Sequence, residues 1–209
     1  MTYFIQNFHR IWGAALEHLL ITMTALGISM ALALPVGVWL VRHRRWYPPV
    51  VGFLSVLYTI PSISLLVFLI PVMGLGFWPT VVALVVYNQA ILVRNIYVGL
   101  TGLDRDMLEA ARGMGMSPRQ VLWQVELPMA LPVIMAGVRV AAISTIAIAT
   151  VAAFFDAGGL GALIREGLSQ DYDQKIYGAV IALSAIAIGT ELVLRLLQRR
   201  SQRFRRAGG

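Results

Sequence analysis

The 209-residue sequence contains no cysteine and only three histidines, and charged residues make up just 13% of it. Soluble globular proteins carry about 25% charged residues, and a mean hydropathy of +0.76 also lies outside their usual range. Without cysteine the chain forms no disulfide and offers no thiolate to a metal. The histidines fall in different segments, so no metal site is expected. The composition therefore predicts an integral membrane protein.

Several other function classes lack support in the sequence. The formal net charge is +7, but the basic residues stand at the ends of apolar runs rather than along one polar face, which argues against nucleic-acid binding. There is no GxxxxGKS/T phosphate-binding motif and no nucleophile beside a base, so we expect no enzymatic activity. The N-terminus has no basic region followed by an A-x-A cleavage site. We therefore expect its first apolar run to remain as a membrane anchor.

Five apolar runs are long enough to cross the roughly 30 Å hydrocarbon core of a bilayer as helices. They cover residues 19–41, 50–73, 79–100, 131–155 and 176–197. The sequence thus predicts an all-α membrane domain over residues 19–197. The segments around it are an N-terminal part (1–18), a polar loop (101–130), a second polar segment (156–175) and a basic tail (198–209). The first of these is either a short amphipathic helix in the membrane interface or a frayed end.

The basic residues assign these segments to the two sides of the membrane. The segments around residues 42–45, 101–130 and 195–206 together hold twelve arginines. The N-terminal part and the 156–175 segment hold only Arg10, Arg165 and Lys175. Short cytoplasmic loops are enriched in lysine and arginine. The pattern therefore predicts that the N-terminus and the 156–175 segment are outside, and that the 101–130 loop and the tail are cytoplasmic. An odd number of spans argues against a single-chain inverted-repeat transporter.

The 101–130 loop carries signals for two short helices. Asp104 is placed to cap the first, and Gly113 and Gly115 are placed to end it. Ser117–Gln120 has the form of a capping box with proline at the first helical position. We expect a second helix to begin there and to end before Pro128.

The spacing in this loop resembles a family pattern. Glu109-Ala110-Ala111 is followed after three residues by Gly115, and Leu127-Pro128 closes the pattern. This is similar to the EAA loop of membrane-spanning subunits of binding-protein-dependent ABC importers. The resemblance implies that the loop docks on a separate cytoplasmic ATPase; the alternative is a solvated linker. The implied coupling residues are Glu109, Ala110, Ala111, Gly113, Gly115, Ser117 and Pro118. Ala110, Ala111 and Gly115 leave one flank with little side-chain bulk, where another surface comes close to the backbone.

Other segments resemble permeases that import quaternary-amine osmoprotectants such as glycine betaine and choline. They are YTIPSIS, RNIYVGL, LPVIMAGVRVA and AAFFDAGGLGALI, although Asp156 stands where a small residue is expected. The resemblance implies a type I ABC importer permease, multi-pass in the bacterial cytoplasmic membrane, surrounded by lipid. Its implied partners are a second permease chain, an extracytoplasmic binding protein and an ATPase dimer that holds ATP and Mg. This chain would bind no cofactor. A permease for methionine or another amino acid is the alternative, and an ion-coupled carrier or channel is a lower one.

Polar residues near mid-membrane have two interpretations, because an unsatisfied polar group in lipid is costly. They either line a translocation pathway or form hydrogen bonds between helices, and the second is favoured for Ser62. The candidates for the pathway are Tyr58, Pro61, Ser62, Tyr87, Asn88 and Gln89. Arg94 and Arg139 are either part of an inner gate or reach lipid phosphates. Glu191 and Arg195 are spaced for a local ion pair.

Overall fold

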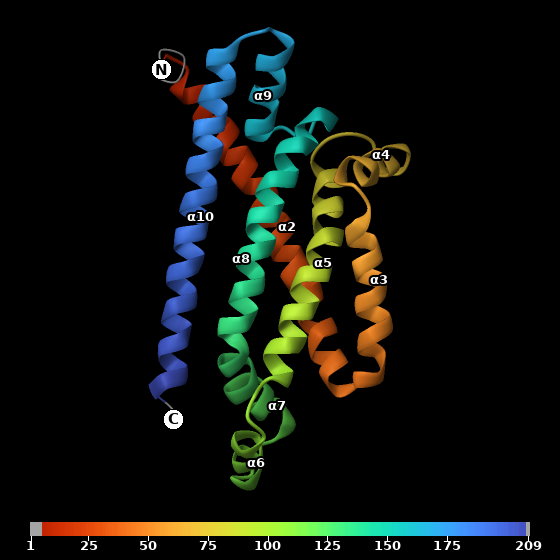
Figure 1. Ribbon diagram of the computed structural model, residues 1–209, viewed down its shortest axis with the longest axis vertical. Helices are drawn as coiled ribbons and strands as arrows, with labels where there is room; N and C mark the ends of the chain where they lie inside the picture. Colours follow the sequence, from red (N-terminus) through yellow and green to blue (C-terminus); the bar gives the residue numbers. More distant parts are fainter. Residues whose placement is uncertain (1–5, 208–209) are drawn as a thin grey trace.

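The computed structural model describes residues 6–207, and every regular element in that range is a helix. Long helices run side by side along the molecule, with α6 and α7 at one end and α4 and α9 at the other (Figure 1). The elements are α2 (Phe8–Arg42), a short 3-10 turn (Arg44–Trp46), α3 (Tyr47–Thr59), α4 (Ser62–Met73), α5 (Phe77–Thr101), α6 (Arg105–Gly113), α7 (Pro118–Gln120), a π-helical turn (Val121–Glu126), α8 (Leu127–Ala152), a 3-10 turn (Ala153–Phe155), α9 (Gly159–Ser169) and α10 (Asp173–Ala207). This confirms the all-α membrane fold.

The predicted second span is broken. Four helices are long and apolar enough to cross a membrane alone, whereas residues 44–59 and 62–73 are two helices bent by 93° that pass only as a pair. Pro61 has no N–H to donate, and Ile60 before it is extended, as residues preceding proline usually are. The hydroxyl of Tyr87 on α5 donates to the Ile60 carbonyl and so satisfies a group that the break leaves free. The described part of the chain therefore has five spans only if this bent pair counts as one.

The described part of the N-terminal segment is continuous with the first span. From Phe8 onward it belongs to α2, which continues to Arg42. Ile11 and Ala15 are buried against Leu160 of α9 and neighbouring side chains, so this face packs inside the protein. Residues 1–5 of this predicted segment lie outside the described residues. Likewise, the predicted tail is the last part of α10 as far as residue 207.

Small residues let the central helices approach closely. α5 lies against both α2 and α8. A Cβ added to Gly37 of α2 would lie 2.5 Å from the Ile96 side chain, and one added to Gly137 of α8 would lie 2.5 Å from that of Asn95. Such contacts are the usual basis of helix packing within membranes, where dispersion replaces the hydrophobic effect. These three helices therefore form the core of the molecule.

The predicted 156–175 segment contains a helix, α9, that is joined to α2. The Glu17 carboxylate accepts a hydrogen bond of 2.7 Å from the Gly159 N–H. Gly158 and Gly159 both have positive φ, at 81° and 68°. A Cβ on Gly158 would lie 2.3 Å from the Glu17 carboxylate, so this turn needs glycine for its backbone angle and for its contact.

Ion pairs fix the far end of α9. Glu166 accepts from Arg10 at 2.6 Å and from Lys175, whose side chain is only 3% exposed. The hydrogen bond from Lys175 lowers the pKa of Glu166 below its ordinary 4.5; burial opposes this shift, and the charges of Lys175, Arg10 and Arg165 add to it. Arg165 pairs separately with Asp156 at 2.9 Å. The charged groups of this segment are thus partly used to hold α9 and α10 together.

The depressed pKa of Glu166 predicts a pH-dependent stability. The carboxylate stabilises the folded chain above pH 4.5, and this contribution is lost as the pH falls below that value because the group then takes up a proton. The apparent Tm of the purified chain in detergent should fall more steeply below about pH 4.5 than that of the Glu166→Gln variant. Glu109→Gln, at an exposed position, should behave as wild type. Parallel pH profiles for all three would contradict the assignment.

Candidate functional site

Residues 104–126 fold into a helical hairpin, which we call the coupling hairpin. As predicted, Asp104 caps α6, because its Oδ1 accepts from the Asp106 N–H at 2.9 Å. The helix ends in a Schellman motif: the Gly115 N–H donates to the Arg112 carbonyl and the Met116 N–H donates to that of Ala111. Gly115 is the residue that reverses the chain, with φ of 82°.

The predicted capping box is confirmed, but the helix that it starts does not end before Pro128. Ser117 Oγ accepts from the Gln120 N–H at 3.4 Å, and the Ser117 N–H donates to Gln120 Oε1 at 2.8 Å. The chain then passes through the π-helical turn, where the Leu127 N–H donates to the Leu122 carbonyl five residues earlier. A wider turn adapts the backbone to a proline that cannot donate. The helix consequently runs on from Pro118 to Phe155.

Small buried apolar side chains hold the two helices of the hairpin together, and larger apolar side chains are exposed on its surface. Ala111 and Val121 are buried, and Glu109 and Ala110 are exposed. Ala111 therefore supports the hairpin from within instead of lying on its bare flank. Sequence reasoning missed Met114 and Trp123, which are 77% and 63% exposed. Large apolar side chains on an otherwise polar surface are typical of a protein contact. Their presence in a polar loop was the feature of the sequence that could have identified them as contact residues.

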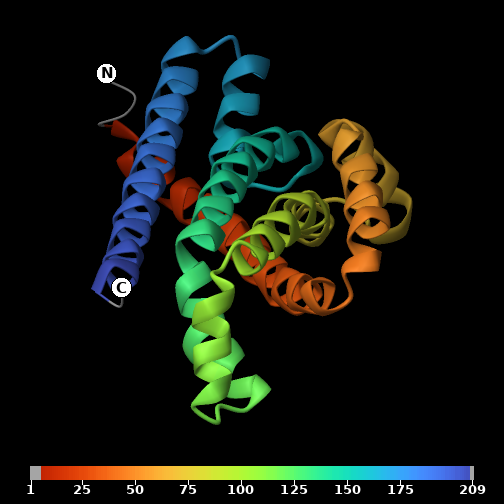
Figure 2. The same ribbon diagram turned by 60° about the horizontal axis from the view of Figure 1, so that its bottom comes forward.

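Close contacts with neighbouring atoms do not require glycine at the two glycine positions of the hairpin. A Cβ added to Gly113 or Gly115 would meet no atom within 4 Å. Gly113 is the last residue of α6, whereas Gly115 has a backbone angle that side chains with a Cβ rarely adopt. The two positions are therefore distinguishable by mutation. Figure 2 shows the hairpin projecting beyond the turn that joins α2 to α3.

Three of the predicted pathway residues gather at the break between α3 and α4. Tyr58 and Pro61 are exposed, and Ser62 is half-buried. The ring of Tyr58 meets that of Tyr87 edge to face, with centroids 5.8 Å apart. Tyr87 itself is buried and bonded to the Ile60 carbonyl. The break thus presents one exposed aromatic ring that rests on a buried one.

Asn88 lies in the interior and links three helices. Its side chain is 1% exposed, and its Nδ2 donates to Ser29 Oγ of α2 at 3.2 Å and to Thr145 Oγ1 of α8 at 3.0 Å. The neighbouring Gln89 donates to the Ser29 carbonyl at 3.2 Å. These bonds are the interhelical kind, and the Asn88 side chain presents no open surface to a solute.

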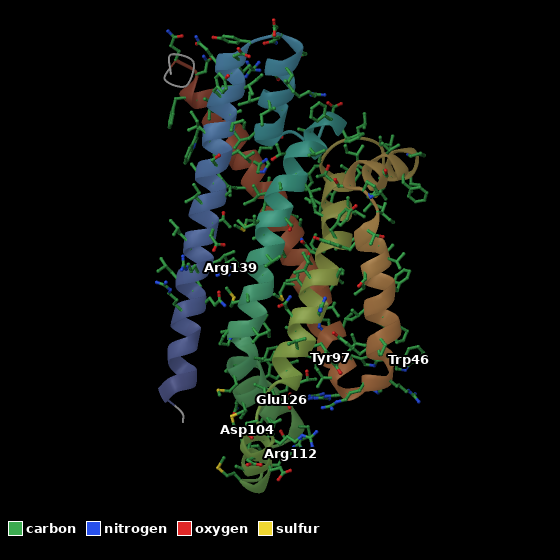
Figure 3. The ribbon with its side chains drawn as sticks, in the orientation of Figure 1. Trp46, Tyr97, Asp104, Arg112, Glu126 and Arg139 are labelled. Carbon is green, nitrogen blue, oxygen red and sulfur yellow. The ribbon has the colours of Figure 1, made fainter. Side chains whose placement is uncertain are left out.

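Arg94 and Arg139 lie on different helices. Arg94, on α5, is exposed. Arg139 instead lies beside α10 (Figure 3), with its Nε 3.5 Å from a carboxylate oxygen of Glu191. Among the described residues Glu191 forms no ion pair with Arg195, so the predicted local pair is wrong. The reason is that α10 turns Glu191 towards α8, where a half-buried arginine competes for it.

The Asn88 bonds predict a large effect on stability. Asn88→Ala removes the interhelical hydrogen bonds to Ser29 and Thr145 and leaves each of those buried hydroxyls with only a bond inside its own helix, which should lower the free energy of unfolding by about 1–3 kcal/mol. Thr101→Ala is the matched control, because the Thr101 hydroxyl donates only within its own helix, to the Tyr97 carbonyl. Thermal unfolding of both purified variants measures the difference. Equal losses of unfolding free energy would show that the hydrogen bonds between the three helices stabilise the chain no more than one bond within a helix.

The chain resembles known proteins in both sequence and fold. Residues 23–206 match the family described as binding-protein-dependent transport system inner membrane component. The carnitine transport permease protein OpuCB of Listeria monocytogenes is 38% identical over 96% of this chain and 92% of its own length. The choline transport system permease protein OpuBB of Bacillus subtilis is 37% identical over 88% of this chain and 85% of its own. A structure of the MetNI methionine ABC transporter in an inward-facing conformation has a TM-score of 0.82 at 23% identity, covering 96% of this chain and 99% of its own, which supports the fold alone.

Proposed function

Because this chain belongs to the family of inner membrane components of binding-protein-dependent transport systems, we propose that its coupling hairpin is the surface on which a separate ATPase acts. The chain is a permease subunit of an ABC importer, a multi-pass inner membrane protein and not an enzyme. Such importers work with an ATPase and a substrate-binding protein. ATP and Mg would be held by the ATPase, since this sequence has no phosphate-binding loop.

The observation that carries the proposal is the unbroken helix from the hairpin into the membrane. Pro118 begins the helix at the hairpin, and the same helix extends to Phe155. A displacement of the hairpin by a partner would therefore move α8 as well, because a continuous helix is stiff along its axis. α8 packs on α5 and α10, so the motion would reach the rest of the bundle.

Each coupling residue has a physical role in this proposal. Glu109 and Ala110 are exposed and form the contact face, and Ala110 adds little bulk to it. Gly115 sets the reversal between the two helices through its positive φ. Ser117 and Pro118 fix the start of the second helix. Gly113 and Ala111 complete the hairpin without touching the partner directly. The exposed Met114 and Trp123 would add apolar contact area.

Transport would occur between two permease chains, identical or related, that alternate between inward-open and outward-open states. We place Tyr58, Pro61 and Ser62 on the pathway, because the break between α3 and α4 exposes them in part. Asn88 and Gln89 would hold the helices of each chain together instead. A role for Arg139 in an inner gate would require its ion pair with Glu191 to open. Arg94, which is exposed, would be available to a gate or to lipid.

We propose that the solute is a quaternary amine such as glycine betaine, choline or carnitine. The named relatives transport carnitine and choline, and they align with most of this chain. A quaternary ammonium group donates no hydrogen bond and is attracted to aromatic faces. The exposed ring of Tyr58, supported by Tyr87, offers such a face. The methionine alternative has less support, since the methionine transporter shares the fold at only 23% identity.

The role of the hairpin predicts opposite results at two neighbouring glycines. Gly115→Val should reduce ATP-driven uptake of radiolabelled glycine betaine by the reconstituted complex on the order of tenfold, because a β-branched residue resists positive φ at a cost of about 1–2 kcal/mol. Gly115→Asn should keep more activity, since asparagine tolerates this angle. Gly113→Ala should transport normally, since its Cβ would meet nothing. Normal uptake by Gly115→Val would contradict the coupling assignment.

The aromatic contact predicts a preference for a ring at position 58. Tyr58→Leu should reduce the uptake of choline about two- to fivefold, the size expected for an exposed cation–π contact, whereas Tyr58→Phe should retain it. Uptake at saturating binding protein measures both variants. If the leucine and phenylalanine variants transport choline equally well, the ring has no part in the pathway.

A further inference from the structure

A pocket of about 490 Å³ lies between the coupling hairpin and the ends of α2 and α5. Four arginines line it: Arg42 and Arg44 from the end of α2 and the following turn, and Arg105 and Arg112 from α6. Glu126 of the π-helical turn is its one acidic residue. Figure 3 shows Arg112 and Glu126 at this end of the molecule. Pro118 is the one coupling residue that lines the pocket, and none of the proposed pathway residues does.

The arginines have no carboxylate partner among the residues that the structure describes. Among the described residues no ion pair or side-chain hydrogen bond engages Arg42, Arg44, Arg105 or Arg112, whereas Arg10, Arg139 and Arg165 each have a carboxylate partner. Four guanidinium groups around one cavity, with a single carboxylate, leave an excess of positive charge. Guanidinium binds phosphate through paired, charge-assisted hydrogen bonds, so the pocket is suited to a phosphate group.

The pocket also has an apolar side that belongs to the membrane spans. Val38 and Val41 come from the last turns of α2, and Leu100 comes from the last turn of α5. Trp39 and Trp46, both exposed, lie at the same end, where interfacial tryptophans mark the level of lipid headgroups. Figure 3 shows Trp46 at this level. The cavity thus lies where the hydrocarbon ends and the headgroups begin.

From this arrangement we infer that the pocket binds the phosphate of an anionic phospholipid. The arginines hold the phosphate, and the glycerol and upper acyl chain lie along Val38, Val41 and Leu100. Basic pockets between helices at a membrane surface bind such headgroups. An acidic segment of a protein partner would satisfy the arginines but not the apolar side. A free phosphate ion would likewise leave the apolar side without a ligand.

Native mass spectrometry of the full chain, released from nanodiscs with and without its partner ATPase, tests the inference. The probes are phosphatidylglycerol and cardiolipin, with zwitterionic phosphatidylethanolamine for comparison. Arg42→Gln combined with Arg112→Gln should weaken retention of the anionic lipids on the order of thirtyfold. Arg45→Gln combined with Arg119→Gln removes the same charge from residues that do not line the pocket and should retain them as wild type does.

Further measurements distinguish a lipid phosphate from free phosphate and from a protein partner. Arg44→Gln with Arg105→Gln should reproduce the loss if the pocket as a whole binds the lipid. Titration with inorganic phosphate should not displace phosphatidylglycerol; displacement would assign the pocket to free anions and overturn the lipid. Loss of lipid on binding of the ATPase would assign the arginines to that protein instead. Equal retention by both pairs of variants would overturn the site. None of these outcomes depends on which solute is transported.

Discussion

The structure depends on the requirement that backbone N–H and C=O groups in a bilayer be hydrogen-bonded within the protein. Long helices meet this requirement, and most of the chain consists of them. Two departures from regular α-helix bear on the proposed function: the break at Ile60–Pro61 in the second span, and the π-helical turn at Val121–Glu126 in the coupling hairpin. Each is compensated locally. The Tyr87 hydroxyl donates to the carbonyl freed at the first, and wider helical hydrogen bonding adapts the second to Pro128.

Both departures fall where the proposed function needs them. The bend at Pro61 turns α4 aside, and the chain is partly exposed at the break between α3 and α4, which supports a pathway residue at Tyr58. The π-helical turn keeps the hairpin continuous with α8, which supports the transmission of force from an ATPase. Around them, the close contacts of α2, α5 and α8 and the Asn88 hydrogen bonds form a core that would move as one body. Irregular backbone and rigid core together fit a transporter that changes conformation.

Local signals in the sequence predicted the parts of the structure that depend on neighbouring residues. The Asp104 cap, the Ser117 capping box and the reversal near Gly115 all follow from side chains within a few positions. Hydropathy predicted apolar runs that fall on the long helices, but not the bend between α3 and α4. The partner of Glu191 could not be predicted from such signals, because it depends on which face of α10 meets α8. Neither could the α9 contact with Glu17, which joins residues far apart in the chain.

The central claim is that the coupling hairpin, and not the opposite end of the bundle, contacts the ATPase. The chain has no native cysteine, so a single introduced one is unique. Ala110→Cys places it on the exposed face of the hairpin, and Leu75→Cys places it in the exposed turn at the other end. Cross-linking of each variant to the ATPase in membranes compares the two ends directly. The account predicts a cross-linked product from position 110 and none from position 75, and the reverse result would contradict it.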